Sequence, residues 1–166
     1  MKKTISILSI ISLCVAATAL LLAIALLTVF WKPACRLYGA SVDVMAAGPA
    51  ISVSSVVSML TGLAIAVGAC VFTKSSRTIV FEIIAVLLII GIPVLDTLLS
   101  HVEAAAIGHW AGGEKLVALS MSSSIISVAA GLMGKAKALC LVICGMSISE
   151  KVISKRIASE AKQTIA

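Results

Sequence analysis

Residues 4–31 read TISILSIISLCVAATALLLAIALLTVFW, a stretch without one charged side chain, and it decides the fold class. A transmembrane helix needs about 20 mainly apolar residues, because it rises about 1.5 Å per residue and the hydrocarbon core is about 30 Å thick. The basic pair before this stretch also opens secretory signals, but the apolar region of a signal peptide is only about 7 to 15 residues long. We therefore expect a retained signal anchor that forms the first helix across a membrane.

Three further apolar stretches are long enough to cross, at about residues 48–72, 79–100 and 116–137. With 61% hydrophobic and 12% charged residues and a mean hydropathy of +1.21, the chain has too little polar surface for a soluble globule. We predict an all-α integral membrane protein: a four-transmembrane-helix bundle over residues 1–148, followed by a basic amphipathic cytoplasmic helix over residues 149–166. The lipid bilayer is the first expected partner. No nucleic-acid partner is expected, because the net charge of +6 lies at the ends of the spans.

Lys and Arg are divided unevenly between the two sides that four crossings define. One side would hold ten of them, whereas the other would hold three, namely Lys32, Arg36 and Lys115. Short cytoplasmic loops carry the excess of Lys and Arg. The count predicts a multi-pass protein of the cell membrane with both termini in the cytoplasm, and the basic opening suggests a bacterial inner membrane.

The third stretch carries a proline and two carboxylates. A proline ring removes a backbone donor and pushes against the preceding turn, so we expect a helix kink at Gly91 and Pro93. Ionised side chains cost about 2.5 to 3.5 kcal/mol at the centre of a membrane helix on insertion scales. Glu82 lies near the expected helix start, where the helix dipole and a basic turn favour an acid. Asp96 lies among apolar residues, and it lies deeper if the helix continues beyond residue 100.

Glu82 and Asp96 are the candidate transport residues. Their spacing places them within roughly 40° on one helix face and about 21 Å apart along it. In this interpretation Asp96 binds a proton or cation near the kink and Glu82 lies at the inner mouth. An ion- or proton-coupled small-solute channel or transporter is the alternative function, because no third ionisable group lies in an uncharged span to complete a relay.

Small residues recur at every fourth position in two of the stretches. This spacing forms a stripe along one face of a helix, and small side chains let helix backbones approach closely. We expect both stripes to pack, on each other or across a subunit boundary; serine-lined faces that wet a pore are the alternative. The stripes are Ser54, Ser58, Gly62 and Ala66 in the second stretch, and Ser123, Ser127 and Gly131 in the fourth.

Residues that bind metals or react covalently form no recognisable motif. Of five cysteines only Cys35 lies on the expected outer side, so no internal disulfide is predicted. His101 and His109 are separated by a gap that fits no standard zinc spacing. Their segment, residues 100–115, is expected to lie at the membrane surface with Trp110 as an anchor. We expect no metal, no cofactor and no catalytic residue, because no acid, base, nucleophile or metal set converges.

The chain after residue 137 allows two registers. The fourth helix can continue inward as one long rod with an apolar seam for a partner or for lipid. Alternatively, Lys135 and Lys137 can lie inside a later fourth span, where they can pair with Asp96. The preferred function is a small non-enzymatic membrane subunit that forms a homo-oligomer or joins a larger membrane-protein complex.

Overall fold

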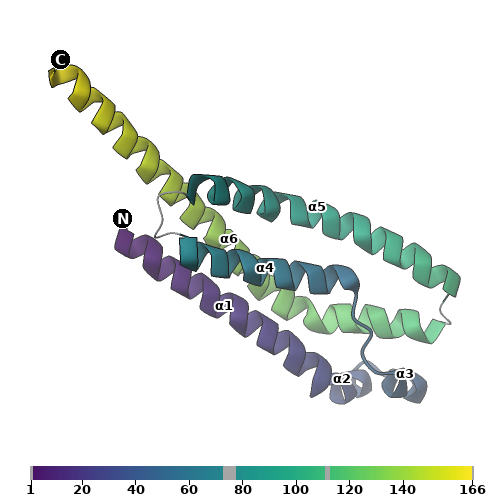
Figure 1. Ribbon diagram of the computed structural model, residues 1–166. Helices are drawn as coiled ribbons and strands as arrows, with labels where there is room; N and C mark the ends of the chain where they lie inside the picture. The colour runs from purple at the N-terminus through teal and green to yellow at the C-terminus, as the bar shows by residue number, and fades with distance from the viewer. Residues whose placement is uncertain (1, 73–77, 111–112, 166) are drawn as a thin grey trace.

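The computed structural model describes residues 2–72, 78–110 and 113–165, with side chains except at 72, 78, 81, 103–104, 106–110, 114–115 and 161–165. All regular structure in these residues is helical (Figure 1). Four helices are long and apolar enough to cross a membrane, within Lys2–Thr28, Val53–Val71, Glu82–Val102 and Leu116–Glu160. By helix length and hydropathy this is a multi-pass membrane protein, which confirms the predicted fold class.

The first helix, α1, spans Lys2–Thr28 and packs against α6 and α4. Its buried positions alternate at intervals of three and four residues, and most are serine or alanine. Such small side chains let two helix backbones approach closely. The buried positions are Ile5, Ser9, Ser12, Ala16, Ala19, Ala23 and Leu27.

Two short helices, α2 (Trp31–Leu37) and α3 (Val42–Ala47), cap one end of the bundle (Figure 1). The chain leaves α1 after Thr28, three residues before the expected end of the first span, and turns into α2. The side chain of Ser41 begins α3 by accepting a hydrogen bond from the Val44 amide at 3.4 Å. Apolar side chains of α2 and α3 then form a small second core against the start of α6.

The middle helices, α4 (Val53–Phe72) and α5 (Thr78–Trp110), pack on each other and on α6. The expected basic turn between them, residues 74–77, lies outside the described residues. Pro93 lies within α5, and the helix continues on both sides of it to Trp110, ten residues beyond the expected end. Asp96 therefore has more than three helical turns after it rather than one.

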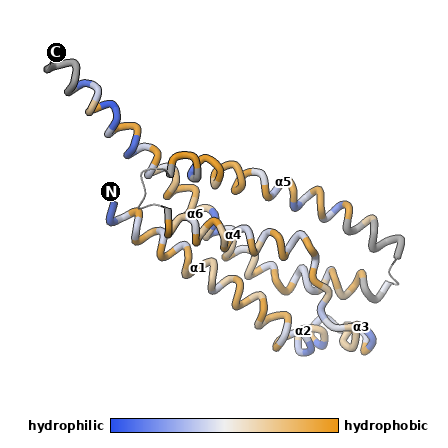
Figure 2. The backbone as a smooth tube through the Cα atoms, in the orientation of Figure 1, coloured by the Kyte–Doolittle hydropathy of each residue, from blue (hydrophilic) through white to orange (hydrophobic). Residues whose placement is uncertain are grey.

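The last helix, α6, runs from Gly113 to Ile165 as one helix of 53 residues. Residues 149–165 form its end and are not a separate basic helix. Figure 1 shows this end extending past the other helices, and Figure 2 shows that hydrophilic residues are frequent in it. Both chain termini lie at this end of the bundle, which we call the basic end; α2 and α3 lie at the opposite end.

Candidate functional site

Lys135 and Lys137 lie near the middle of the bundle and not at one end. The hydroxyl of Ser12 on α1 donates a hydrogen bond to the carbonyl of Ala136 on α6 at 3.2 Å, which fixes the register between these helices. Ser12 is nine residues past the basic start of α1 at Lys3, a rise of about 14 Å. The two lysines that flank Ala136 therefore lie about 14 Å along the bundle from the start of α1.

An ion pair joins α5 to α6 at the basic end. The Nζ of Lys151 donates to Oε1 of Glu82 at 3.0 Å, and Glu82 is only 3% exposed. Asp96 lies fourteen residues after Glu82 on α5, and Lys137 lies fourteen residues before Lys151 on the antiparallel α6. Lys137 interacts electrostatically with Asp96. Fourteen residues correspond to about 21 Å of helix. Glu82 and Lys151 thus form an ion pair at the basic end, whereas Asp96 and Lys137, about 21 Å further along the two helices, interact only at longer range.

The Lys137 side chain reaches from α6 to α4. Its ammonium donates a hydrogen bond to the Ser58 hydroxyl at 2.8 Å. On the way it passes Gly62, where an added Cβ would lie 3.0 Å from Lys137 Cε and 2.5 Å from Met133 Sδ. A side chain at Gly62 would therefore have to displace the ends of the Met133 and Lys137 side chains, which lie over this position.

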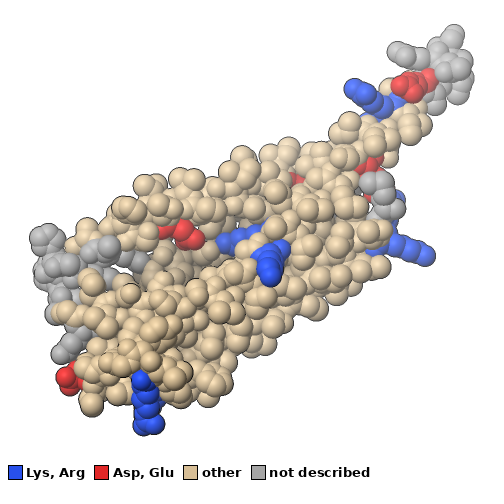
Figure 3. Space-filling view, turned by 180° about the vertical axis from the view of Figure 1, so that it is seen from behind, with Lys and Arg blue, Asp and Glu red and all other residues tan. Residues whose placement is uncertain are grey.

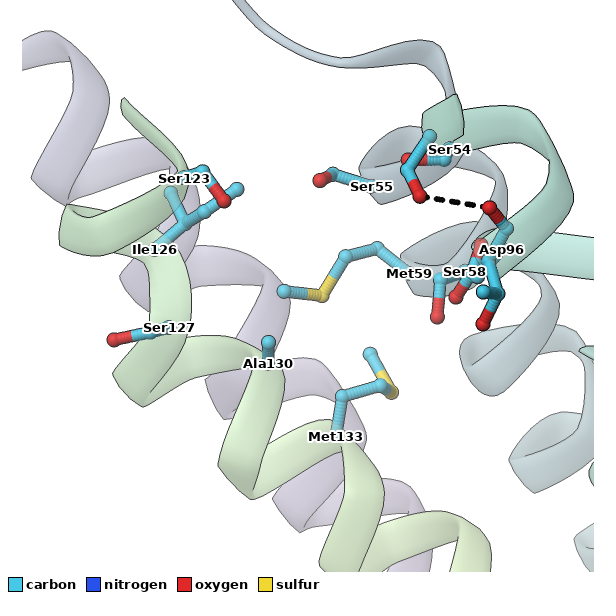
Figure 4. A pocket seen from close by; sticks show the side chains of 12 residues that line it. Ser54, Ser55, Ser58, Met59, Asp96, Ser123, Ile126, Ser127, Ala130 and Met133 are labelled. Atoms are coloured by element: carbon cyan, nitrogen blue, oxygen red, sulfur yellow. Dashed lines mark hydrogen bonds between the residues drawn. The ribbon is translucent and has the colours of Figure 1, made fainter. Parts of the chain in front are cut away.

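A cavity of about 430 Å³ lies next to this pair, between α4, α5 and α6. Figure 4 shows how its side chains converge, with Asp96 turned towards Ser54 and Ser58. The volume is in the range of about 300 to 1,000 Å³ that small-ligand sites occupy. The polar lining consists of Ser54, Ser55, Ser58, Asp96, Thr97, Ser100, Ser123 and Ser127, and the apolar lining of Met59, Ile126, Ala130 and Met133.

The cavity presents more hydrogen-bond acceptors than donors on its α5 side. The hydroxyls of Thr97 and Ser100 donate to the carbonyls of Pro93 and Thr97, at 2.8 and 2.9 Å, so they offer lone pairs to the cavity. Oδ1 of Asp96 is buried without a hydrogen-bond partner. A buried acceptor left without a donor costs about 1 to 3 kcal/mol, more when it is charged. This oxygen is the atom of the site that most requires a ligand.

The surface around the cavity carries opposite charges where the rest is apolar. In the space-filling view of Figure 3, acidic and basic side chains meet near the middle of an otherwise largely uncharged face, where the surface is hollowed. Lys135 is exposed at this depth, two residues from the half-buried Lys137.

The two small-residue stripes have different environments. On α4, Ser54, Gly62 and Ala66 are buried and Ser58 is half-buried. On α6, Ser123, Ser127 and Gly131 are exposed, and an added Cβ at Gly131 would meet nothing within 4 Å. Ser54 and Ser58 line the cavity from α4, and Ser123 and Ser127 line it from α6.

The remaining candidates lie away from the cavity or outside the described side chains. His101 is exposed, with Nδ1 2.8 Å from the Thr97 carbonyl of its own helix. The side chains of His109 and Trp110 are not among those described. Cys35 is buried and free in α2, where burial raises the pKa of its thiol and a backbone hydrogen bond lowers that pKa by less. Within the described residues, no three potential metal-binding side chains come together.

Sequence reasoning named Lys137 only as a possible partner of Asp96 and did not consider Lys151 for Glu82. A signal for both was present, because the interval from Lys137 to Lys151 equals the interval from Glu82 to Asp96. Equal intervals on antiparallel helices allow both pairs to form in one register. Comparisons of the chain with protein-family models, with curated proteins and with solved structures find no match.

Proposed function

We propose that this protein moves a small solute or protons across the membrane through the cavity beside Asp96. The observation that carries the proposal is the buried carboxylate oxygen of Asp96, which has no hydrogen-bond partner and lies in a hydroxyl-lined cavity between α4, α5 and α6. Asp96 lies in a helix that is long and apolar enough to cross a membrane. Ionisable side chains are costly in such helices, and in membrane proteins they mark substrate, ion and proton pathways.

The distribution of charge supports a path that begins at the basic end. Glu82 and Lys151 lie there, about 21 Å from Asp96 along α5, and both carboxylates of α5 lie on the side of that helix that faces α6. Lys137 balances the charge of Asp96, so the empty site carries no net charge. A neutral site can be embedded between membrane-spanning helices, and a change of protonation or of bound ligand then changes its charge.

Flux measurements on the purified full-length protein in liposomes test the proposal. A pH gradient is imposed, and an internal pH-sensitive dye reports proton entry. Asp96→Asn keeps the size of the side chain and removes its charge, so we expect it to reduce the protein-dependent flux at least tenfold. Asp43→Asn is the matched control, because it removes the same charge from the exposed first turn of α3.

Two results would contradict the proposal. One is a wild-type protein that adds no flux of protons or of any solute to that of empty liposomes. The other is a flux that Asp96→Asn and Asp43→Asn reduce equally. Circular dichroism of each variant checks that its helices are retained.

A role as an assembly subunit is the second candidate, and the exposed face of α6 favours it. Ser123, Ser127 and Gly131 lie on this face one turn apart, and the exposed Lys135 follows one turn later. A lysine exposed on a membrane-spanning helix is costly where it faces lipid, whereas a carboxylate on a neighbouring transmembrane helix would stabilise it. Native mass spectrometry of the gently solubilised protein tests this role. A defined oligomer or complex that Gly131→Leu dissociates is expected, and a monomer throughout would exclude it. Neither candidate function includes catalysis.

A further inference from the structure

Among the side chains that the structure describes, the charged groups around Asp96 form a small and balanced set. Within residues 53–71 of α4 there is no Asp, Glu, Lys, Arg or His, and Cys70 is the one titratable side chain of that segment. The groups that α6 presents to α5 are Lys137 beside Asp96 and Lys151 beside Glu82; Lys135 is exposed, and Cys140 and Cys144 are buried between the helices. On α5 itself, His101 is exposed. Asp96 and Lys137 therefore supply one negative and one positive charge to the site.

Neither of these two charges has a full partner within the protein. Oδ1 of Asp96 has no hydrogen-bond donor, and the Lys137 ammonium donates to the neutral hydroxyl of Ser58. Glu82 and Lys151 form a direct ion pair, whereas Asp96 and Lys137 interact only at longer range. Hydrogen bonds between charged groups are stronger than those to neutral groups. The site thus lacks a cationic donor at Asp96 and an anionic acceptor near Lys137.

Electroneutrality restricts which ligand can supply both a cationic donor to Asp96 and an anionic acceptor near Lys137. A cation at Asp96 would leave an unbalanced positive charge between the membrane-spanning helices, and an anion at Lys137 would leave a negative one. An unbalanced charge is costly in a medium of low dielectric constant. A solute that carries one charge of each sign adds no net charge, so it can satisfy both groups without any change in protonation.

We propose that the cavity binds a small zwitterion, a solute with an ammonium group and a carboxylate a few bonds apart. The ammonium lies against Oδ1 of Asp96 and the lone pairs of Thr97 and Ser100. The carboxylate lies towards Ser58, which accepts from Lys137 and so has its own hydrogen left to donate. This inference rests on the proposed function and names the class of solute that the site takes.

Three probes of similar size separate this ligand class from the others. β-Alanine has both charges, propionate has only the carboxylate, and propylammonium has only the ammonium. Binding is measured by ligand-observed NMR on the full-length protein in lipid nanodiscs. We expect β-alanine to bind wild-type protein at least tenfold more tightly than either singly charged probe. This comparison needs no variant, so it remains decisive if a variant fails to fold.

Variants of the two charged residues then assign the two ends of the solute. Asp96→Asn removes the charge-assisted hydrogen bond to the solute ammonium, and Lys137→Gln removes the positive charge that lies behind Ser58 and attracts the solute carboxylate. Each variant is therefore expected to weaken β-alanine binding by about tenfold or more. Asp96→Asn leaves the charge of Lys137 unbalanced, so this variant should bind propionate more tightly than the wild type does. Lys137→Gln leaves the charge of Asp96 unbalanced, so this variant should bind propylammonium more tightly. Lys135→Gln is the matched control, because it removes the same charge from an exposed position two residues away, and it should leave β-alanine binding unchanged.

Equal binding of β-alanine and either singly charged probe to the wild-type protein would overturn the inference, as would β-alanine binding that neither Asp96→Asn nor Lys137→Gln weakens. The same measurements distinguish a failure of this inference from a failure of the proposed function. If Asp96→Asn abolishes proton flux but β-alanine does not bind, transport through the cavity stands and the zwitterion is wrong. If β-alanine binds as expected but no flux of protons or β-alanine occurs, the site binds zwitterions without transporting them.

Discussion

Removal of Lys151 is expected to destabilise the protein far more than removal of the charge on Glu82, although the two residues form one ion pair. Glu82 is 3% exposed, whereas Lys151 is 22% exposed. Lys151→Met leaves a carboxylate buried between α5 and α6 without its cation. Breaking a buried ion pair in this way costs about 3 to 5 kcal/mol. Glu82→Gln leaves a lysine whose long side chain can reach the membrane surface, and we expect it to cost about 1 kcal/mol.

The double variant Glu82→Gln, Lys151→Met distinguishes an unbalanced charge from a loss of packing. Because both charges are gone, we expect it to recover to within about 1 kcal/mol of the wild type. Lys155→Met is the control, since it removes the same charge from an exposed position one helical turn later; its effect should stay within about 0.5 kcal/mol. The free energy of unfolding is measured by titration of detergent micelles with sodium dodecyl sulfate, with circular dichroism as the signal.

The reasoning predicts an order as well as magnitudes. Lys151→Met must be the least stable variant, and the double variant must be more stable than Lys151→Met alone. Equal losses for Lys151→Met and Glu82→Gln would show that Glu82 is solvated in the membrane-embedded protein. A loss below about 1 kcal/mol for Lys151→Met would refute the assignment of a buried ion pair, because exposed pairs contribute about 0 to 1 kcal/mol.

Three further predictions follow from the helix contacts and from α2. Gly62→Leu should destabilise the protein by about 1 to 3 kcal/mol, because the new side chain overpacks against Met133. Gly131 has open space around it, so Gly131→Leu should leave the stability of the monomer unchanged in the same unfolding assay. Ser12→Ala should cost about 0.6 kcal/mol, the average for a hydrogen bond between membrane helices. Burial raises the pKa of the Cys35 thiol, so in a variant whose only cysteine is Cys35 we expect alkylation to be slow at neutral pH and to accelerate as pH rises. Mass spectrometry follows the alkylation. Fast alkylation at pH 7 would show that α2 is not packed as described.

The pH dependence of stability follows from the same shift at Cys35. A raised pKa means that the folded protein holds the thiol proton more tightly than the unfolded chain does. The contribution of the Cys35 thiol to the free energy of unfolding is therefore fully present below the pKa of the thiol in the unfolded chain. It is lost as pH rises through the pKa of the thiol in the folded protein. A Cys35→Ser variant should lack this alkaline loss.

Several features of the site could be predicted from the sequence because they depend on one helix alone. The interval between Glu82 and Asp96 predicts a shared helix face, and both residues do lie on the side of α5 that faces α6. The depth of Asp96 was left open, because it depends on where α5 ends. Hydropathy alone is a poor guide to that end, since a helix can continue at the membrane surface once its apolar part is complete.

The two lysines of α6 show the opposite case. Lys135 and Lys137 look like the end of a span, because a lysine pair after an apolar run is the usual mark of a membrane boundary. In the structure α6 continues past them for another 28 residues, and Ala136 accepts a hydrogen bond from Ser12 of α1. The Ser58 hydroxyl on α4 and the Asp96 carboxylate on α5 stabilise Lys137 there, and both residues are distant from it in the sequence.

The sequence by itself determined the class of the protein and the number of long apolar helices, because transfer into a membrane depends on the summed hydropathy of about 20 consecutive residues. Only the tertiary structure decided which small-residue stripe is buried, where the charged groups of α6 lie, and which carboxylate each lysine meets. Lipid tails are as apolar as leucine, so hydropathy favours no helix register over another. The register arises instead from contacts such as the one between Ser12 and Ala136, which are 124 residues apart in the chain.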